Sequence, residues 1–271
     1  AIFYPPAPGE PRLQYLTSVS DSSDLVPPMN AFKKFLLGDS STDISGIVKP
    51  YGMAIQGTKL YVCDTVSAQI HVLDFEARTW DHFRPEVSGG VKKIITIAVD
   101  SQNVRYISDA MRGDVIVNSP EGKYIASIAG VEKMKPVGLA VSEDRIIIGD
   151  LNQSKVHVYD KASRQLLFSI PQNADNEEEQ IFAPTNIALD DEGNIYVSDT
   201  GAFRVQKYGP EGDYIRTFGG HGDSPGQFAR NKGIAVDRNG ILYAVDAASQ
   251  TIQMFDAEGN LLLYFGEQEG S

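Results

Sequence analysis

The sequence contains few of the residues that most often build chemical sites. It has one cysteine, Cys63, one tryptophan and four histidines in 271 residues. A lone cysteine cannot form an internal disulfide, so cysteine usage does not decide the compartment. Cys63 also shares a repeat position, described below, with Ser108, Gly149, Ser198 and Val245. We therefore interpret Cys63 as a small packed side chain and not as a nucleophile.

Positive charge and long apolar runs are scarce as well. The chain carries 24 Lys and Arg against 36 Asp and Glu, a net charge of −12. A surface this acidic repels phosphate backbones, so nucleic acid is not an expected partner. No run approaches the 18 or so apolar residues that a membrane-spanning helix needs. The length fits one large domain, which we place at residues 12–271.

The first residues suggest export. Residue 1 is Ala and not Met, and residues 1–11 contain four prolines, which predicts an extended tether. A removed targeting segment followed by such a tether fits an exported protein, periplasmic or at the cell surface. A sequence that starts inside a longer chain is the alternative.

The chain does contain a strong internal repeat. An aspartate ends the second apolar run of each copy, with spacings of 45, 41, 49 and 47 residues. We call these residues the anchor aspartates: Asp64, Asp109, Asp150, Asp199 and Asp246. Four short apolar runs, separated by Gly, Pro, Asp and Asn, fill each period, which is typical of a propeller blade. The sequence thus predicts an all-β propeller with four-stranded antiparallel blades at about 50–83, 94–128, 136–170, 184–218 and 232–265.

One position in the first strand of each copy favours small residues. It holds Gly52, Thr96, Gly138, Asn186 and Gly233. Small side chains there predict an innermost strand that is crowded against the central axis.

Two stretches resemble a known family. Gly219 to Phe228 reads Gly-Gly-His-Gly-Asp-Ser-Pro-Gly-Gln-Phe and precedes Gly233-Ile-Ala-Val-Asp237, while Tyr196-Val-Ser-Asp199 precedes Arg204-Val-Gln. These residues are similar to NHL repeats, and the resemblance covers residues 50–266. It implies a ring-shaped propeller, commonly six-bladed, which serves many unrelated functions.

The two ends predict how the ring is completed. Residues 12–19 resemble the fourth strand of a blade but lack three strands beside them, and Leu261 to Gly266 is also a fourth strand. A six-bladed plan would use strand 12–19 to close a further blade, which protects sheet edges. The alternative is a five-bladed ring with this strand packed on its edge. Residues 31–38 predict one or two helical turns.

The anchor aspartates fall on the face formed by the connections between blades and the turns between second and third strands. A ring of metal ligands or acids is one interpretation. A structural brace is the other, because a carboxylate at a strand end can accept hydrogen bonds from the following turn. We favour the brace, since a single site does not need the same residue in every blade.

The histidines argue against zinc chemistry. His71 and His157 share one repeat position in third strands, and His82 falls in an outer strand, so only His221 lies on a face-forming loop. Catalytic zinc generally takes three converging protein ligands. This disfavours the peptidyl-hydroxyglycine lyases that resemble NHL propellers. Propeller lactonases that resemble gluconolactonases hold a divalent ion with Glu, Asn and Asp at inner-strand ends, where this chain offers only Asn186. This weakens the lactonase interpretation, but a further blade could add ligands, so calcium stays open and no metal ligand is assigned.

The residues just before the inner strands vary between blades while the framework does not. They are Tyr51, Ile95, Val137, Thr185 and Lys232. With Asn186 and His221 they form the candidate binding surface at the channel face. We therefore expect a non-enzymatic scaffold that recognises a protein or peptide. The alternative is a metal-dependent lyase or lactonase with its ion in the channel, and the sequence leaves the oligomeric state open.

Overall fold

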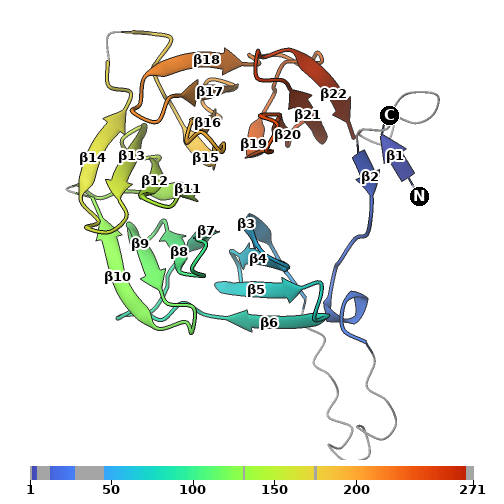
Figure 1. The fold of residues 1–271 in the computed structure, drawn as a ribbon, viewed down its shortest axis with the longest axis vertical. Helices are drawn as coiled ribbons and strands as arrows, with labels where there is room; N and C mark the ends of the chain where they lie inside the picture. The colour runs from blue at the N-terminus through green and yellow to red at the C-terminus, as the bar shows by residue number, and fades with distance from the viewer. Residues whose placement is uncertain (1, 5–12, 28–45, 131, 174–175, 267–271) are drawn as a thin grey trace, which may run out of the picture.

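The chain forms an all-β propeller of five four-stranded antiparallel blades around one central axis (Figure 1). The computed structural model describes residues 2–4, 13–27, 46–130, 132–173 and 176–266. Blade 1 consists of β3 (Pro50–Gln56), β4 (Lys59–Asp64), β5 (Gln69–Asp74) and β6 (Thr79–Phe83). Blade 2 consists of β7 (Ile94–Val99), β8 (Arg105–Asp109), β9 (Asp114–Asn118) and β10 (Tyr124–Ala129).

The other three blades repeat this order from the axis outwards. Blade 3 consists of β11 (Pro136–Val141), β12 (Arg145–Asp150), β13 (Lys155–Asp160) and β14 (Leu166–Ile170). Blade 4 consists of β15 (Pro184–Leu189), β16 (Ile195–Asp199), β17 (Arg204–Tyr208) and β18 (Tyr214–Phe218). Blade 5 consists of β19 (Asn231–Val236), β20 (Leu242–Asp246), β21 (Thr251–Phe255) and β22 (Leu261–Phe265). The five predicted blade ranges therefore agree with the structure to within a residue or two.

The hydrophobic core lies between blades, because alternate side chains of each strand point to the two neighbouring blades. Tyr61 and Ile70 of blade 1 pack against Ile97 and Ile107 of blade 2, and the next interfaces repeat this arrangement. The core is therefore a series of similar sheet-on-sheet contacts.

The innermost strands are as crowded as the small residues predicted. A Cβ atom added to Gly52 would lie 2.3–2.4 Å from atoms of Thr96 on the neighbouring blade. One added to Gly138 would lie 3.1 Å from Ile187. Small residues here allow β3 to approach β7, and β11 to approach β15, side by side.

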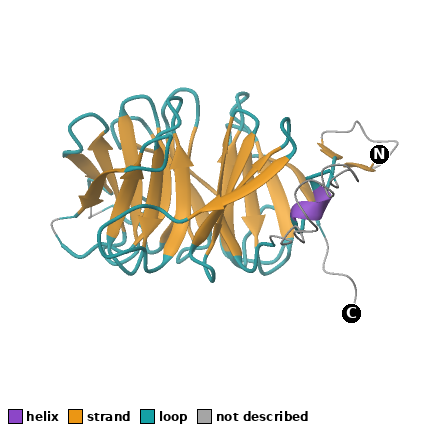
Figure 2. Cartoon of the chain, turned by 90° about the horizontal axis from the view of Figure 1, so that it is seen from below, coloured by secondary structure: helices purple, strands orange, loops and turns teal. Residues whose placement is uncertain are grey.

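The N-terminal segment differs from the expected tether. Ile2–Tyr4 forms a strand, β1, which pairs antiparallel with β2 (Leu13–Tyr15). β2 is shorter than the strand expected over residues 12–19. A 3-10 turn, η1 (Ser22–Asp24), follows at the edge of the ring (Figure 2), and the next residue, Leu25, packs against blade 1. The helical turns expected over residues 31–38 lie outside the described residues.

Blades 1 and 5 do not meet as the other neighbours do. β3, β7, β11, β15 and β19 pack side by side in that order, but in the described part of the chain no comparable packing joins β19 to β3. Figure 1 shows this opening beside β2 and β22. The structure therefore holds five blades, and the six-bladed plan stays a prediction. Within the described residues, no helix is long and apolar enough to cross a membrane.

Candidate functional site

Each anchor aspartate fastens two loops at one end of its blade. The buried carboxylate of Asp64 accepts hydrogen bonds from the backbone N–H groups of Val48 (2.9 Å) and Lys49 (3.2 Å), which lead into β3. It also accepts them from Val66 (2.9 Å) and Ser67 (3.3 Å) in the turn after β4. Burial raises the pKa of Asp64, but these donors outweigh it and bring the pKa to about 2.

The same arrangement recurs around the ring. Lys93, Lys135, Ala183 and Arg230 each donate a backbone N–H to the anchor aspartate of their own blade, as Lys49 does. We call this end of the propeller the anchor face. It carries the connections between blades and the turns between second and third strands.

A ring of cations surrounds the channel on the anchor face. Lys49, Lys93, Lys135 and Arg230 occupy one repeat position and are exposed. Each directly precedes the innermost strand of its blade, so its backbone lies at the channel mouth. Sequence reasoning missed this ring, although aligning the residues 15 or 16 before each anchor would have revealed it.

Exposed apolar side chains share the anchor face with these cations. Val48, Val66, Met111 and Phe182 are each more than half exposed. The backbone N–H of each donates to an anchor aspartate. Buried carboxylates therefore hold the backbone from which these exposed side chains project.

The structure exposes some of the predicted surface residues and buries others. Tyr51, Ile95, Val137, Thr185 and Lys232 all lie at a β-bulge in the first strand of their blade. Bulges of this kind re-aim side chains near binding sites. Three of the five, however, are buried between blades: Ile95, Val137 and Thr185. The Thr185 hydroxyl is also held 2.6 Å from that of Thr200, so it contributes to structure.

The remaining predicted residues are accessible or join blades. Tyr51 and His221 are exposed, and the His221 ring packs on Phe203 with centroids 4.5 Å apart. Lys232 is partly buried, and burial together with the nearby Arg230 lowers its pKa. Asn186 reaches the carbonyl of Lys232 at 3.2 Å when its amide is oriented to donate, which links blades 4 and 5.

The histidines are dispersed through the ring. His71 lies inside blade 1, where its Nδ1 accepts a 3.1 Å hydrogen bond from the Trp80 indole. His157 lies inside blade 3, with Nδ1 2.8 Å from the Ser169 hydroxyl. Within the described residues, no three His, Cys, Asp or Glu side chains gather closely enough to hold a metal ion.

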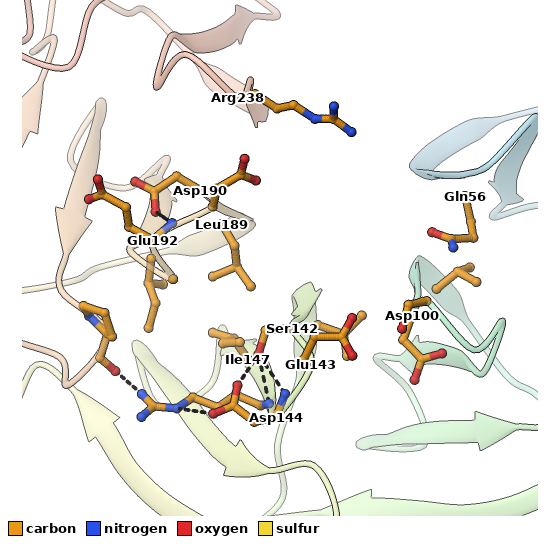
Figure 3. A pocket seen from close by; sticks show the side chains of 18 residues that line it. Gln56, Asp100, Ser142, Glu143, Asp144, Ile147, Leu189, Asp190, Glu192 and Arg238 are labelled. Carbon is orange, nitrogen blue, oxygen red and sulfur yellow. Dashed lines mark hydrogen bonds and ion pairs between the residues drawn. The ribbon is translucent and has the colours of Figure 1, made fainter.

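The opposite end of the channel carries a cavity of about 810 Å³ (Figure 3). We call it the acidic mouth, because Asp100, Glu143, Asp144, Asp190 and Glu192 line it with Arg145 and Arg238. Two of its carboxylates already serve the framework. Asp100 accepts from Tyr106 and lies 2.9 Å from the Lys161 ammonium, and Asp190 accepts from Tyr196.

These features define the class of the protein as a β-propeller with four-stranded blades. Residues 183–208, which contain β15 to β17, match the model of the NHL repeat. The chain therefore contains an NHL repeat within a β-propeller, as its motifs predicted. No match was found among curated proteins.

Several solved structures share the fold. A streptogramin B lyase is 15% identical with a TM-score of 0.62, over 80% of this chain and 68% of that one. A catalytically inactive virginiamycin B lyase from Staphylococcus aureus with quinupristin is 13% identical with a TM-score of 0.62, over 83% and 72%. A chain of the nidogen/laminin complex is 14% identical with a TM-score of 0.65, over 83% and 85%. At these identities the likeness concerns the fold alone.

Proposed function

We propose that this protein is a non-enzymatic scaffold that binds a protein or peptide partner on the anchor face. The observation that carries the proposal is the set of exposed apolar side chains Val48, Val66, Met111 and Phe182 on the anchor face, whose backbone N–H groups are held by buried carboxylates. Exposed apolar surface rimmed by polar residues marks interaction sites. A backbone that is ordered before binding loses less entropy when the partner arrives.

The cation ring favours a partner that carries negative charge. Lys49, Lys93, Lys135 and Arg230 add positive charge around the apolar side chains, on a protein whose net charge is −12. Complementary charge steers encounter and selects among partners. We therefore expect a partner segment that combines carboxylates with an aromatic or aliphatic anchor. An exported location fits such a role and stays a prediction.

Selection from a displayed peptide library against the full chain tests the proposal. We expect enrichment of peptides that pair Asp or Glu with an apolar residue, and loss of their binding to a Val66→Asp, Phe182→Asp variant. Tyr51→Ala and Lys232→Ala should weaken binding more mildly. Leu167→Asp is the matched control, because Leu167 is an exposed apolar residue on the outermost strand of blade 3. Enriched peptides that bind the Val66→Asp, Phe182→Asp variant as well as the parent would contradict the anchor face as the site.

A metal-assisted lyase or lactonase is the second candidate, and the acidic mouth is the observation that favours it. The cavity there is large enough for a small substrate and lined with hard oxygen donors. Metal analysis after exhaustive dialysis separates the two functions. About one calcium or zinc ion retained per chain would favour the enzyme and would be followed by a screen of lactones and hydroxyglycine peptides.

A further inference from the structure

Three neighbouring strands of blade 3 bring an aspartate, a histidine and a serine together. His157 on β13 pairs across the sheet with Ser169 on β14, and its Nδ1 lies 2.8 Å from the Ser169 hydroxyl. On the opposite edge of the imidazole, Nε2 lies 3.5 Å from Oδ2 of Asp150, at the end of β12. His157 is 6% exposed and Asp150 is fully buried, so water competes little for these groups.

The brace around Asp150 leaves one carboxylate oxygen for this histidine. The backbone N–H groups of Lys135 and Asn152 both donate to Oδ1, each at 2.9 Å. In the other four blades, the residue just before the equivalent of Lys135 donates to Oδ2 of its anchor aspartate. That residue is Val48, Lys92, Phe182 or Ala229. Within the described residues, Oδ2 of Asp150 has no hydrogen-bond partner, so His157 is the group that its charge orients.

This arrangement sets the tautomer of the imidazole. Burial raises the pKa of Asp150, but His157 and the two backbone donors outweigh it and lower the pKa, so the carboxylate is anionic at neutral pH. A carboxylate beside Nε2 favours the tautomer that carries its proton on Nε2. Nδ1 is then an acceptor for the Ser169 hydroxyl proton, which is how a general base activates a serine.

The other blades lack this combination at the same pair of positions on their third and fourth strands. The pairs there are His71 with His82, Ile116 with Ser127, Gln206 with Thr217, and Gln253 with Tyr264. Among the five described blades, blade 3 alone therefore sets an aliphatic hydroxyl opposite an imidazole. A brace common to every blade does not require that hydroxyl.

A cavity of about 360 Å³ lies beside these groups, and both the imidazole and Ser169 line it. Ser169 is partly exposed, so its hydroxyl is open to a ligand. Lys155 and Arg164 add positive charge to the wall, Glu132 adds one negative charge, and Leu166 adds apolar surface. The cavity therefore fits a small molecule with an apolar part and an anionic group.

We propose that blade 3 carries an esterase site in which Ser169 is the nucleophile and His157 the general base, with Asp150 positioning the histidine. The substrate class is a small acyl ester that bears a carboxylate. The Ser169 oxygen attacks the ester carbonyl carbon while its proton moves to Nδ1 of His157, and the imidazolium protonates the alkoxide that leaves. Water then attacks the acyl-serine, gives a proton to His157, and releases the acid as that proton returns to the Ser169 oxygen.

The positive charge of Lys155 and Arg164 on the same cavity favours the oxyanion that forms on the carbonyl oxygen. None of the exposed apolar residues of the anchor face lines this cavity. The activity is therefore separate from the partner binding proposed above, and the failure of either proposal leaves the other standing.

Labelling with a fluorophosphonate tests the nucleophile, because this reagent modifies activated serines. We expect one label per full-length chain, located on Ser169 by peptide mass spectrometry. Ser127 is the internal control, since it holds the same repeat position in blade 2 and faces Ile116 instead of a histidine. The comparison uses the unaltered chain and so does not depend on the folding of a variant. Absence of label on Ser169, or equal labelling of Ser127, would overturn the proposal.

Variants test the two supporting residues. His157→Gln should slow labelling about 100-fold, the size of a general-base contribution, and blades 4 and 5 already hold Gln at this position. Asp150→Asn should lower kcat for the 4-nitrophenyl ester of succinic acid with little change in KM. It should also slow labelling without lowering the final label per chain, whereas a loss of folded protein would lower that final value. An unchanged labelling rate in His157→Gln, or ester hydrolysis that survives Ser169→Ala, would contradict the assignment.

Discussion

At the scale of single residues, the anchor aspartates show how one side chain serves two loops. Asp64 accepts four backbone donors, two from the segment before β3 and two from the turn after β4. Asp199 accepts from Phe182 and Ala183, and there burial outweighs the donors and raises its pKa. The same residue type at the same repeat position therefore has opposite pKa shifts, because burial outweighs the donors around Asp199 and the donors outweigh burial around Asp64.

This difference predicts that removing the charge of Asp64 and of Asp199 lowers the free energy of unfolding by unequal amounts. Asp64→Asn should lower the free energy of unfolding at pH 7 by about 2 kcal/mol, since a carboxyl with a depressed pKa stabilises the folded state above its unfolded pKa. That stability should be lost as the pH falls from about 4 through about 2 in the parent protein. Urea unfolding between pH 7 and pH 2.5 measures both effects.

Asp199→Asn is the matched control. Its cost at pH 7 should be smaller, because the charge of Asp199 is buried with fewer donors and its removal relieves part of that penalty. Equal losses in the two variants would show that donor number does not set the contribution of an anchor aspartate.

At the scale of strands, the fit of β3 against β7 depends on one missing side chain. Gly52→Ala should destabilise the protein by about 1–3 kcal/mol, because its Cβ would meet Thr96 backbone and side-chain atoms at 2.3–2.4 Å. Thermal unfolding of the full chain measures the loss.

Gly233 occupies the same position in blade 5, beside the opening. The nearest atom to an added Cβ is 3.8 Å away, on Val245 of its own blade. Gly233→Ala should therefore change stability by less than about 0.5 kcal/mol. A loss as large as that of Gly52→Ala would mean that another element already packs against β19.

At the scale of the whole molecule, stability should be greatest in the middle of the row of blades. Blades 2, 3 and 4 are packed on both faces, whereas blades 1 and 5 each leave one face partly exposed. In repeat architectures each unit is stabilised by its own fold and by its neighbours. Amide hydrogen exchange should therefore be slowest in β8, β12 and β16 and faster in β20.

Blade 1 should exchange at an intermediate rate, since the N-terminal segment covers part of its open face through Val19 and Leu25. Exchange that is uniform across all five blades would contradict an opening between the end blades.

The sequence by itself determined the blades, because its features are local. Period-two apolar runs, turn residues and a repeated aspartate recur at 41–49 residues, and each acts through neighbours within one blade. Even the crowding at Gly52 followed from small residues at one repeat position. The brace at each anchor aspartate was also foreseeable, since it joins a strand end to the adjoining loops.

Only the tertiary structure decided which surface residues are accessible. Val137 and Thr185 looked as free as Tyr51 in the sequence, but both are buried in the folded ring. Met53 and Ile97 share one repeat position. Met53 is exposed because it lies on the first blade of the row, where no preceding blade packs against it in the described part of the chain. The repeat fixes which way a side chain points, while the presence or absence of a neighbouring blade decides whether a partner can touch it.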